Sequence, residues 1–381
     1  MRVFYLTFLA LILFANLFAQ KEKYSSKEKD EYYNNNKAIY SPFTPIEKEV
    51  ILKFKPKYYE IKDSEIEYEH YSEERYSRLR TSGIPTQYVG KIDKAKILKY
   101  EKKDSIVAFI YKYSAFENIF FGESGIWIGY SENNGKDWSY YYTGIVEKQP
   151  VFLKWYSKRP LIKEKGKLEI DACLLQQLSP FSHPVSTHSY ECVKDGIYIV
   201  FDINTLAKDS DNDGLTDIVE EKLYTDKNNR DTDGDGILDN IDTNPRKYYP
   251  RTEKTKIYEA LLNEAINWKN KRWIGELLLK EDNYYVTDST ETVLIITDNE
   301  DLMGIQPKNY RVIFMTTDEY SKITKVYDTE LNEMSISPLF KVDNRKNTYR
   351  MSDNFNTWGS SYLIKKKKRS WTIQLLSYWI S

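Results

Sequence analysis

Histidine and cysteine are scarce in this chain of 381 residues, which contains three histidines and two cysteines. Because histidine is the side chain used most often as a general acid or base, candidates for that role are few. The sequence also lacks the Gly-x-Ser-x-Gly and His-Glu-x-x-His motifs, a phosphate-binding glycine loop and a Cys-His nucleophile pair with local support. The sequence therefore identifies no catalytic residue and favours a non-catalytic protein.

A large excess of one charge is also absent, because the formal net charge is -1. Together with an ordinary apolar content, this argues against a disordered chain and against a protein that binds a polyanion such as nucleic acid. The length suits two or three domains. The 33 tyrosines would suit aromatic binding platforms, but compositional bias of the genome explains them more simply.

Long apolar runs are missing except at the N-terminus, where Arg2 precedes a nearly continuous apolar run over residues 3–18. Its uninterrupted core, Phe8–Ala15, is shorter than the roughly 20 residues that cross a bilayer. We therefore expect residues 1–19 to be a signal peptide that is cleaved before Gln20, with an uncleaved anchor as the alternative. The protein is then exported to the periplasm, the cell surface or the medium, and no transmembrane segment remains after cleavage.

Export bears on the two cysteines, because thiols outside the cytoplasm tend to oxidise. We therefore expect Cys173 and Cys192 to form a disulfide. Zinc is the alternative, since His183 and His188 lie between the cysteines at a spacing found among zinc ligands. The chain has no Cys-x-x-Cys pair, which favours the disulfide.

Local composition divides the chain after residue 19 into four parts. Residues 20–88 read as a polar leader with a possible helix over Lys57–Leu79. Short runs of β-forming residues separated by turns predict an antiparallel β domain over 89–207. Residues 208–245 are a separate acidic segment. The expected strands of the β domain are Ser105–Tyr113, Gly125–Tyr130, Trp138–Thr143, Val151–Trp155, Leu168–Leu174 and Gly196–Asp202.

The last part, residues 246–381, is expected to be an α+β domain with a helix packed on an antiparallel sheet. Apolar residues recur at helical spacing over Thr252–Lys280, enough for one long helix or two shorter ones. Strand-like runs follow at Thr292–Thr297, Arg311–Thr316, Pro338–Val342, Thr348–Met351, Ser361–Lys365 and Trp371–Trp379. The fold class expected for the whole chain is therefore multidomain, with β and α+β parts.

The octapeptide Ser131–Trp138 (SENNGKDW) lies between two of the expected strands. It resembles the Asp-box of sialidase-like β-propeller blades, Ser-x-Asp-x-Gly-x-x-Trp, with Asn133 in the place of Asp. The resemblance implies a tight hairpin turn with Trp138 packed on the strands. Only one copy is present, so we expect a fragment of one or two blades or an unrelated sandwich, and no complete propeller.

The acidic segment carries the most specific motif. From Asp209 to Asp242 it holds twelve acidic and three basic residues, a local charge of -9. Residues 209–220 match a twelve-residue calcium-binding loop, with carboxylates at positions 1, 3 and 5, Gly at 6, a carbonyl at 7, a water-mediated Asp at 9 and a bidentate Glu at 12. The expected ligands are Asp209, Asp211, Asp213, Leu215, Asp217 and Glu220.

The same pattern recurs 22 residues later, over 231–242. The expected ligands are Asp231, Asp233, Asp235, Ile237, Asp239 and Asp242. The last of these is one methylene shorter than Glu, which weakens bidentate binding or changes the division of ligands. Hard oxygen ligands in flexible loops suit Ca²⁺ better than Mg²⁺. A solvated acidic linker is the alternative, which the recurrence of the pattern disfavours.

Both loops together resemble the thrombospondin type-3 repeat over residues 209–242. The match covers 209–221, Thr225-Asp226, Asn228-Asn229 and 231–236. Lys227 and Arg230 replace prolines of that family and Tyr224 replaces a glycine, and these changes affect the turn between the loops more than the ligands. The resemblance implies a compact segment that winds around bound calcium and stiffens the join between neighbouring domains.

These features favour an exported calcium-binding protein with a binding, adhesion or structural role at a bacterial envelope or cell exterior. Its partner would be a protein or a glycan there. The alternative is a glycan-active, sialidase-like secreted enzyme or a carbohydrate-binding module. Sialidase-type sites need a cluster of arginines, and Arg159 is the only arginine between Gly90 and Asn204.

Overall fold

The computed structural model shows a β-rich chain with several modules, mostly antiparallel sheets and few helices. It describes residues 45–64, 88–90, 92–93, 96–113, 125–146, 149–178, 190–265, 276–278, 291–308, 310–323, 332–342, 345–355, 358–367 and 370–380. The expected signal peptide at 1–19 and the two candidate zinc ligands His183 and His188 lie outside these residues.

The chain divides into two compact units. The larger consists of residues 42–259 and 282–334, and the smaller of residues 1–41, 260–281 and 335–381. Helix α7 (Glu253–Ala265) and strand β15 (Asn332–Ile336) each contain residues of both units. The four-part division expected from composition is neither supported nor opposed by this result and stays a prediction.

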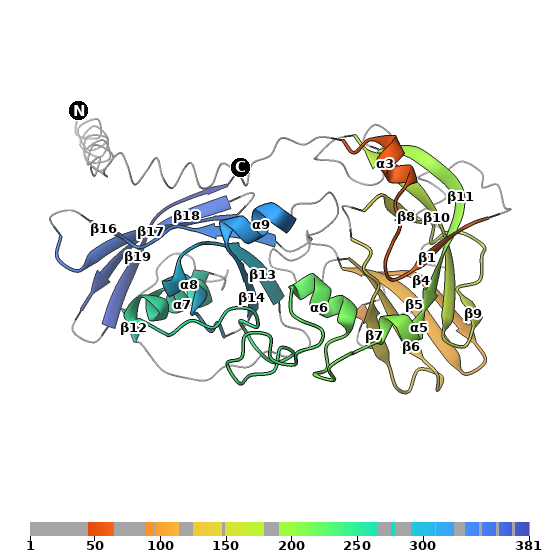
Figure 1. Ribbon diagram of the computed structural model, residues 1–381, viewed down its shortest axis with the longest axis horizontal. Helices are drawn as coiled ribbons and strands as arrows, with labels where there is room; N and C mark the ends of the chain where they lie inside the picture. The colour runs from red at the N-terminus through yellow and green to blue at the C-terminus, as the bar shows by residue number, and fades with distance from the viewer. Residues whose placement is uncertain are drawn as a thin grey trace, which may run out of the picture. The chain divides into compact units, whose positions relative to one another are not determined.

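The larger unit contains a sandwich of two antiparallel sheets (Figure 1). One is a meander in the order β4-β5-β6-β7, and the other has the order β1-β11-β10-β8 with β9 beside β10. Their bounds are β1 Glu60–Asp63, β4 Ile97–Lys103, β5 Ile106–Tyr113, β6 Gly125–Ser131, β7 Ser139–Tyr142, β8 Val151–Leu153, β9 Ile162–Glu164, β10 Lys167–Gln177 and β11 Tyr190–Asp202. Helix α3 (Lys48–Leu52) and a hairpin of β2 (Tyr88–Val89) and β3 (Ile92–Asp93) precede the meander.

Alternation of side chains along the strands explains the sandwich, since successive residues of a strand point to opposite faces. Ala108 and Ile110 of β5 share one buried cluster with Ile170 of β10 and Ile199 of β11. The intervening Phe109 points to the other face of the meander, into a second cluster under the β2–β3 hairpin. Of the two alternatives left by the single Asp-box, the observed architecture is the sandwich.

The turn that resembles an Asp-box joins β6 to β7, as its sequence predicts. Asn133 Oδ1 accepts a hydrogen bond of 2.9 Å from the N–H of Asp137, and Ser131 Oγ accepts one of 3.0 Å from Gly135. Gly135 adopts a φ of 79°, which a glycine tolerates without strain. The ring of Trp138 lies 5.1 Å from that of Phe109. The motif therefore shapes a hairpin and packs on the second cluster.

Strand β1 contradicts the helix expected over Lys57–Leu79 at the residues that are described. Glu60 pairs with Val200 of β11, and the antiparallel register continues to Asp63. The charged pattern of this stretch suits a solvent-facing edge strand as well as a helix, and distant pairing decides between them. Residues 65–79 of the expected helix lie outside the described part of the chain.

The larger unit also holds a parallel pair, which departs from the antiparallel sheet expected here. Strand β13 (Glu291–Ile296) runs parallel to β14 (Tyr310–Met315), with Val293 opposite Val312. Residues 293–296 and 312–315 are continuous buried apolar runs, and such runs are typical of parallel strands buried on both faces. Helix α8 (Glu300–Met303) lies in the connection between them, and α9 (Thr317–Ile323) follows β14.

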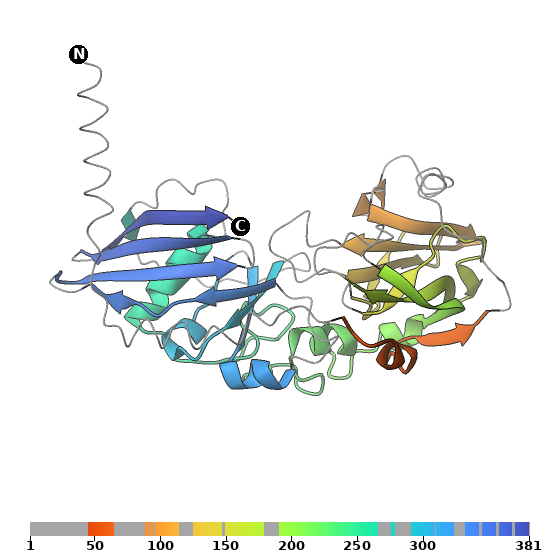
Figure 2. The same cartoon turned by 90° about the horizontal axis from the view of Figure 1, so that it is seen from above.

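The smaller unit contains an antiparallel sheet in the order β12-β19-β18-β17, with β16 beside β17. The bounds are β12 Glu276–Leu278, β16 Phe340–Lys341, β17 Thr348–Phe355, β18 Trp358–Lys366 and β19 Ser370–Ile380. Figure 2 shows the three long strands β17, β18 and β19 side by side. The helix expected through Lys280 is wrong at β12, because Leu277 pairs with Trp371 of β19 and strand pairing overrides the helical spacing.

Candidate metal centre

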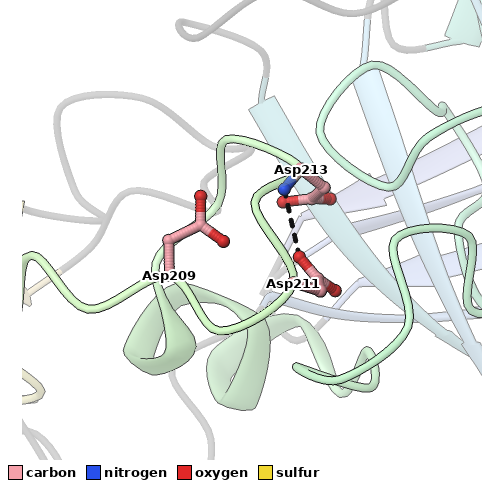
Figure 3. Close-up of side chains that lie close together, drawn as sticks. All are labelled: Asp209, Asp211 and Asp213. Carbon is pink, nitrogen blue, oxygen red and sulfur yellow. Dashed lines mark hydrogen bonds between the residues drawn. The ribbon is translucent and has the colours of Figure 1, made fainter.

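The first acidic loop, residues 209–220 (loop 1), folds around its own aspartates. Asp209 accepts hydrogen bonds from the N–H groups of Asn212, at 2.7 Å, and Gly214, at 3.1 Å. Asp211 accepts one of 3.1 Å from the N–H of Asp213 (Figure 3). Asp213 accepts one of 2.7 Å from the N–H of Leu215. Each aspartate thus uses an oxygen to hold the backbone that follows it.

The second acidic loop, residues 231–242 (loop 2), repeats these hydrogen bonds at the same positions. Asp231 accepts from the N–H groups of Gly234, at 2.9 Å, and Gly236, at 2.8 Å. Asp233 accepts from Asp235 at 3.1 Å, and Asp235 accepts from Ile237 at 2.8 Å. Two segments of different sequence therefore adopt one loop conformation, set by the positions that they share.

Backbone conformation explains the glycine at position 6 of each loop. Gly214 has a φ of 105° and Gly236 a φ of 95°, a region in which a side chain is strained. The residues at position 4, Asn212 and Gly234, have φ values of 62° and 76°. These turns direct the carboxylates of positions 1, 3 and 5 toward a common centre.

Two carboxylate triplets result, Asp209–Asp211–Asp213 and Asp231–Asp233–Asp235. Within each triplet, one oxygen of every residue lies within 4.8 Å of the others, close enough to share a cation. Oδ2 of Asp211, of Asp213 and of Asp233 is buried and has no hydrogen-bond partner among the described residues. Buried carboxylate oxygens without donors are costly, and a bound cation would satisfy them.

The residues at position 12 supply the strongest sign of a cation. Glu220 lies on α6 (Asp217–Leu223), is fully buried, and neither carboxylate oxygen has a hydrogen-bond partner in the described part of the chain. Asp242 is 1% exposed, and its Oδ2 also has no hydrogen-bond partner among the described residues. A hard cation held by oxygen ligands, of the kind that Ca²⁺ prefers, fits both arrangements.

The position-9 aspartates have a different role from the other carboxylates. Asp217 accepts hydrogen bonds from the N–H and the hydroxyl of Ser210, at 2.8 and 3.0 Å. Asp239 accepts the same pair from Thr232, at 2.9 and 2.6 Å. Neither belongs to a triplet, so in this structure they close the loops between positions 2 and 9. A water-mediated contact of Asp217 and Asp239 with the ion stays a prediction.

The carbonyl ligands expected at position 7, Leu215 and Ile237, occupy the turns after the triplets. Their N–H groups are held by the position-5 aspartates as described above, and both residues are half-buried. Their assignment as ligands through the carbonyl oxygen also stays a prediction.

Electrostatics agree with a site built for positive charge. Burial, and then the nearby carboxylates of Asp211 and Asp213, raise the pKa of Glu220 to about 8. Burial likewise raises the pKa of Asp233 and of Asp242 to about 7. For Asp217 the effect of burial is outweighed by hydrogen bonds from Lys208 and Ser210, which lower its pKa. The carboxylates that face the two centres therefore resist ionisation until a cation compensates their charge.

Each loop is attached to a different neighbour in the larger unit. Ile218 of α6 is 2% exposed and belongs to the core cluster of the sandwich. The guanidinium of Arg311 in β14 donates to the carbonyls of Asp242 (3.1 Å), Asn240 (2.8 Å) and Asp239 (3.3 Å). Loop 1 is thus fixed to the sandwich through its exit helix, and loop 2 is fixed to the parallel pair.

Sequence reasoning missed several polar groups at this centre. Oδ1 of Asn240, Oδ1 of Asn244 and the hydroxyl of Thr216 are buried and lack partners among the described residues. The side chain of Asn240 lies against Gly214 of the other loop. Neither these residues nor Arg311 belong to the loop pattern, and only the three-dimensional contacts show them.

The two cysteines lie on the neighbouring strands β10 and β11. Both are free thiols here, Cys173 buried and Cys192 exposed. Interaction with the thiol of Cys173 lowers the pKa of Cys192 below its usual range. The sulfurs are thus near each other, and the disulfide stays a prediction.

Comparison with known proteins identifies no relative. No family model, no curated protein and no solved structure matches the chain. Over the described residues, none of the helices has the length and apolar character needed to cross a membrane.

Proposed function

We propose that this chain is an exported, non-catalytic calcium-binding protein whose acidic segment is held in shape by two calcium ions. The observation that carries the proposal is Glu220, a fully buried carboxylate that faces Asp211 and Asp213 with neither of its oxygens hydrogen-bonded within the described residues. An ionised group in that position needs a cation.

Calcium is the ion that the donor set favours. Loop 1 offers three aspartates and a glutamate, and loop 2 offers four aspartates, all with oxygen ligands. Such hard ligands exclude metals that prefer sulfur or imidazole. Mg²⁺ demands a tight octahedron and keeps its water, whereas Ca²⁺ accepts a larger and more variable set of oxygens.

The ions would act as a rigid joint inside the larger unit. The segment between the loops has few apolar side chains of its own, with Leu223 the main buried one. Its ends are nevertheless fixed, by Ile218 in the sandwich core and by Arg311 on loop 2. Calcium bound in both loops would therefore join the sandwich to the parallel pair at a fixed geometry.

The setting that we propose is a bacterial envelope or the cell exterior, where calcium at about 10⁻³ M keeps loops of this type filled. There the chain would serve as a binding, adhesion or structural protein with a protein or glycan partner. Arg159 does not support the alternative of a glycan-active enzyme, because it is not free to bind a substrate carboxylate. Its guanidinium is engaged by Asp171, at 2.6 Å, and Glu169, at 3.2 Å.

Thermal unfolding of the full chain tests the calcium proposal. We expect the midpoint to rise when calcium replaces a chelator, and the rise to be abolished in the double variant Asp211→Ala/Asp233→Ala. At a free calcium concentration about one hundred times Kd, each ion contributes about 2.7 kcal/mol. Asp226→Ala is the matched control, because Asp226 is an exposed acid between the loops and belongs to neither triplet. An unchanged midpoint in the wild-type chain would refute the proposal.

A further inference from the structure

The two loops differ in how many carboxylate oxygens at position 12 are without a hydrogen bond and therefore available to a cation. In loop 1 both oxygens of Glu220 lack a hydrogen-bond partner within the described chain. In loop 2 the Oδ1 of Asp242 accepts a hydrogen bond of 2.8 Å from the N–H of Asn244, which leaves only Oδ2. Loop 1 therefore presents one more available oxygen than loop 2 at this position, and with it the possibility of bidentate binding.

The charges around the two loops differ in the same direction. The charged groups that act most strongly on Glu220 are carboxylates, those of Asp211, Asp213, Asp239 and Asp217. Asp242 also has Arg311 as a neighbour, a side chain that is 7% exposed and donates to three carbonyls of loop 2. A fixed positive charge beside a cation site weakens cation binding. Loop 1 also has a cation, Lys208, but its side chain is 62% exposed and it pairs with Asp217 at position 9. The surroundings of position 12 are therefore more negative in loop 1.

We propose, building on the calcium-binding function above, that the loops fill in order, and that the weaker second step fixes the parallel strand pair. Loop 1 binds first, and loop 2 binds at a calcium concentration that is higher by about tenfold or more, because ligand number and charge set the affinity of such loops. The protein thus responds to calcium in two stages.

The second stage reaches β14 through the residues that follow loop 2. The N–H of Val312 donates to the carbonyl of Thr243 at 2.8 Å, beside the three bonds from Arg311. Arg246 donates to the carbonyl of Phe314 at 2.7 Å. Without an ion, repulsion among the loop 2 carboxylates opposes the geometry that presents these carbonyls. The first stage acts on the sandwich instead, through Ile218 on α6.

Calorimetric titration of the full-length chain with CaCl₂ alone tests the order of binding. We expect two steps separated by about tenfold or more in Kd. Asp211→Ala should remove the tighter step and Asp233→Ala the weaker one. Glu220→Asp shortens the position-12 ligand of loop 1 to the length found in loop 2 and should bring the two steps together. Glu221→Asp, at the exposed neighbouring position, is the matched control and should leave them apart.

Hydrogen exchange during the same titration tests the coupling to β14. We expect the amides of residues 310–315 to gain protection with the weaker step, and this gain to be lost in Asp233→Ala but kept in Asp211→Ala. Two steps of equal affinity, a tighter step that belongs to loop 2, or protection of β14 that follows the first step would overturn this inference while leaving the proposed function intact. Absence of calcium binding would overturn both.

Discussion

Replacing Glu220 by glutamine should change the stability of the protein in opposite directions with and without calcium. Glutamine keeps the size of the side chain and removes the charge. Without an ion, the charge destabilises the folded state, because Glu220 is fully buried and has no hydrogen-bond donor among the described residues. With an ion bound, the same charge is a ligand.

The gain without calcium follows from the pKa of Glu220, which is about 8 in the folded chain and 4.5 ordinarily. At about pH 7 the unfolded carboxylate is ionised, whereas the buried one must hold a proton. At about 1.4 kcal/mol per pH unit, this costs at most about 3.5 kcal/mol of folding free energy. Because the surrounding carboxylates share the same repulsion, we expect Glu220→Gln to raise the free energy of unfolding by only about 1–2 kcal/mol in chelator.

The loss with calcium follows from binding linkage. Glutamine offers loop 1 one neutral oxygen in place of two charged ones. If the affinity falls by about a hundredfold, the stabilisation by a saturating ion falls by about 2.7 kcal/mol. The variant should therefore be more stable than the wild type in chelator and less stable than the wild type at a calcium concentration that saturates both proteins.

Urea unfolding followed by circular dichroism measures both values. Glu221→Gln is the matched control, since this neighbour is exposed and its partners are Lys57 and Tyr58 at the surface. It should shift stability by less than about 1 kcal/mol, equally in both conditions. A Glu220→Gln variant that is less stable than the wild type in chelator would refute the reasoning that this carboxylate is buried without a partner.

Three further outcomes follow. Gly214→Ala and Gly236→Ala should each destabilise by about 1–2 kcal/mol in urea unfolding, because both glycines have left-handed φ values. The first should cost more, since its new Cβ meets an asparagine side-chain nitrogen at 3.0 Å whereas the second meets nothing within 4 Å, and the reverse order would contradict the structure. Ile218→Ala should cost about 2–5 kcal/mol by the same assay, because that side chain is 2% exposed, whereas Ile241→Ala, at a position 37% exposed, should cost less than about 1 kcal/mol. Equal costs would show that α6 does not pack into the sandwich core. Finally, the calcium-free chain should lose stability as the pH rises from about 4.5 to about 8, because the raised pKa values of the position-12 carboxylates mean that the folded state binds more protons than the unfolded state in this window. Urea midpoints in EDTA that rise with pH would contradict this sign, and calcium should reduce the loss because the ion replaces the protons.

The candidate ligands were largely predictable because the signal is local. Each loop is twelve residues long, and the sequence alone placed Asp209, Asp211 and Asp213 in one cluster. Position 9 was less predictable, since the choice between an ion and the hydroxyl of Ser210 depends on how the loop closes. The contact of Arg311 with loop 2 could not be predicted from the sequence. The two are separated by about 70 residues of chain, and no local pattern indicates a contact over that distance.

The fold shows the same division between local and distant causes. Expected strands such as 125–130 and 371–379 coincide closely with β6 and β19, because alternation and β-forming residues mark them locally. The helix expected over Lys57–Leu79 failed at β1, where pairing with β11 decides the conformation. The parallel register of β13 and β14 depends on which apolar runs become neighbours, and composition does not specify that.

The pairing of β1 with β11 also has a kinetic consequence. Glu60 meets Val200, so the edge of this sheet closes only after most of the sandwich sequence is available. Contacts between residues so far apart carry a large entropic cost of loop closure and slow the folding of β proteins. Loop 1 and loop 2, whose internal hydrogen bonds join residues at most seven apart, need no such search. During synthesis the edge of this sheet therefore stays open until β11 has emerged.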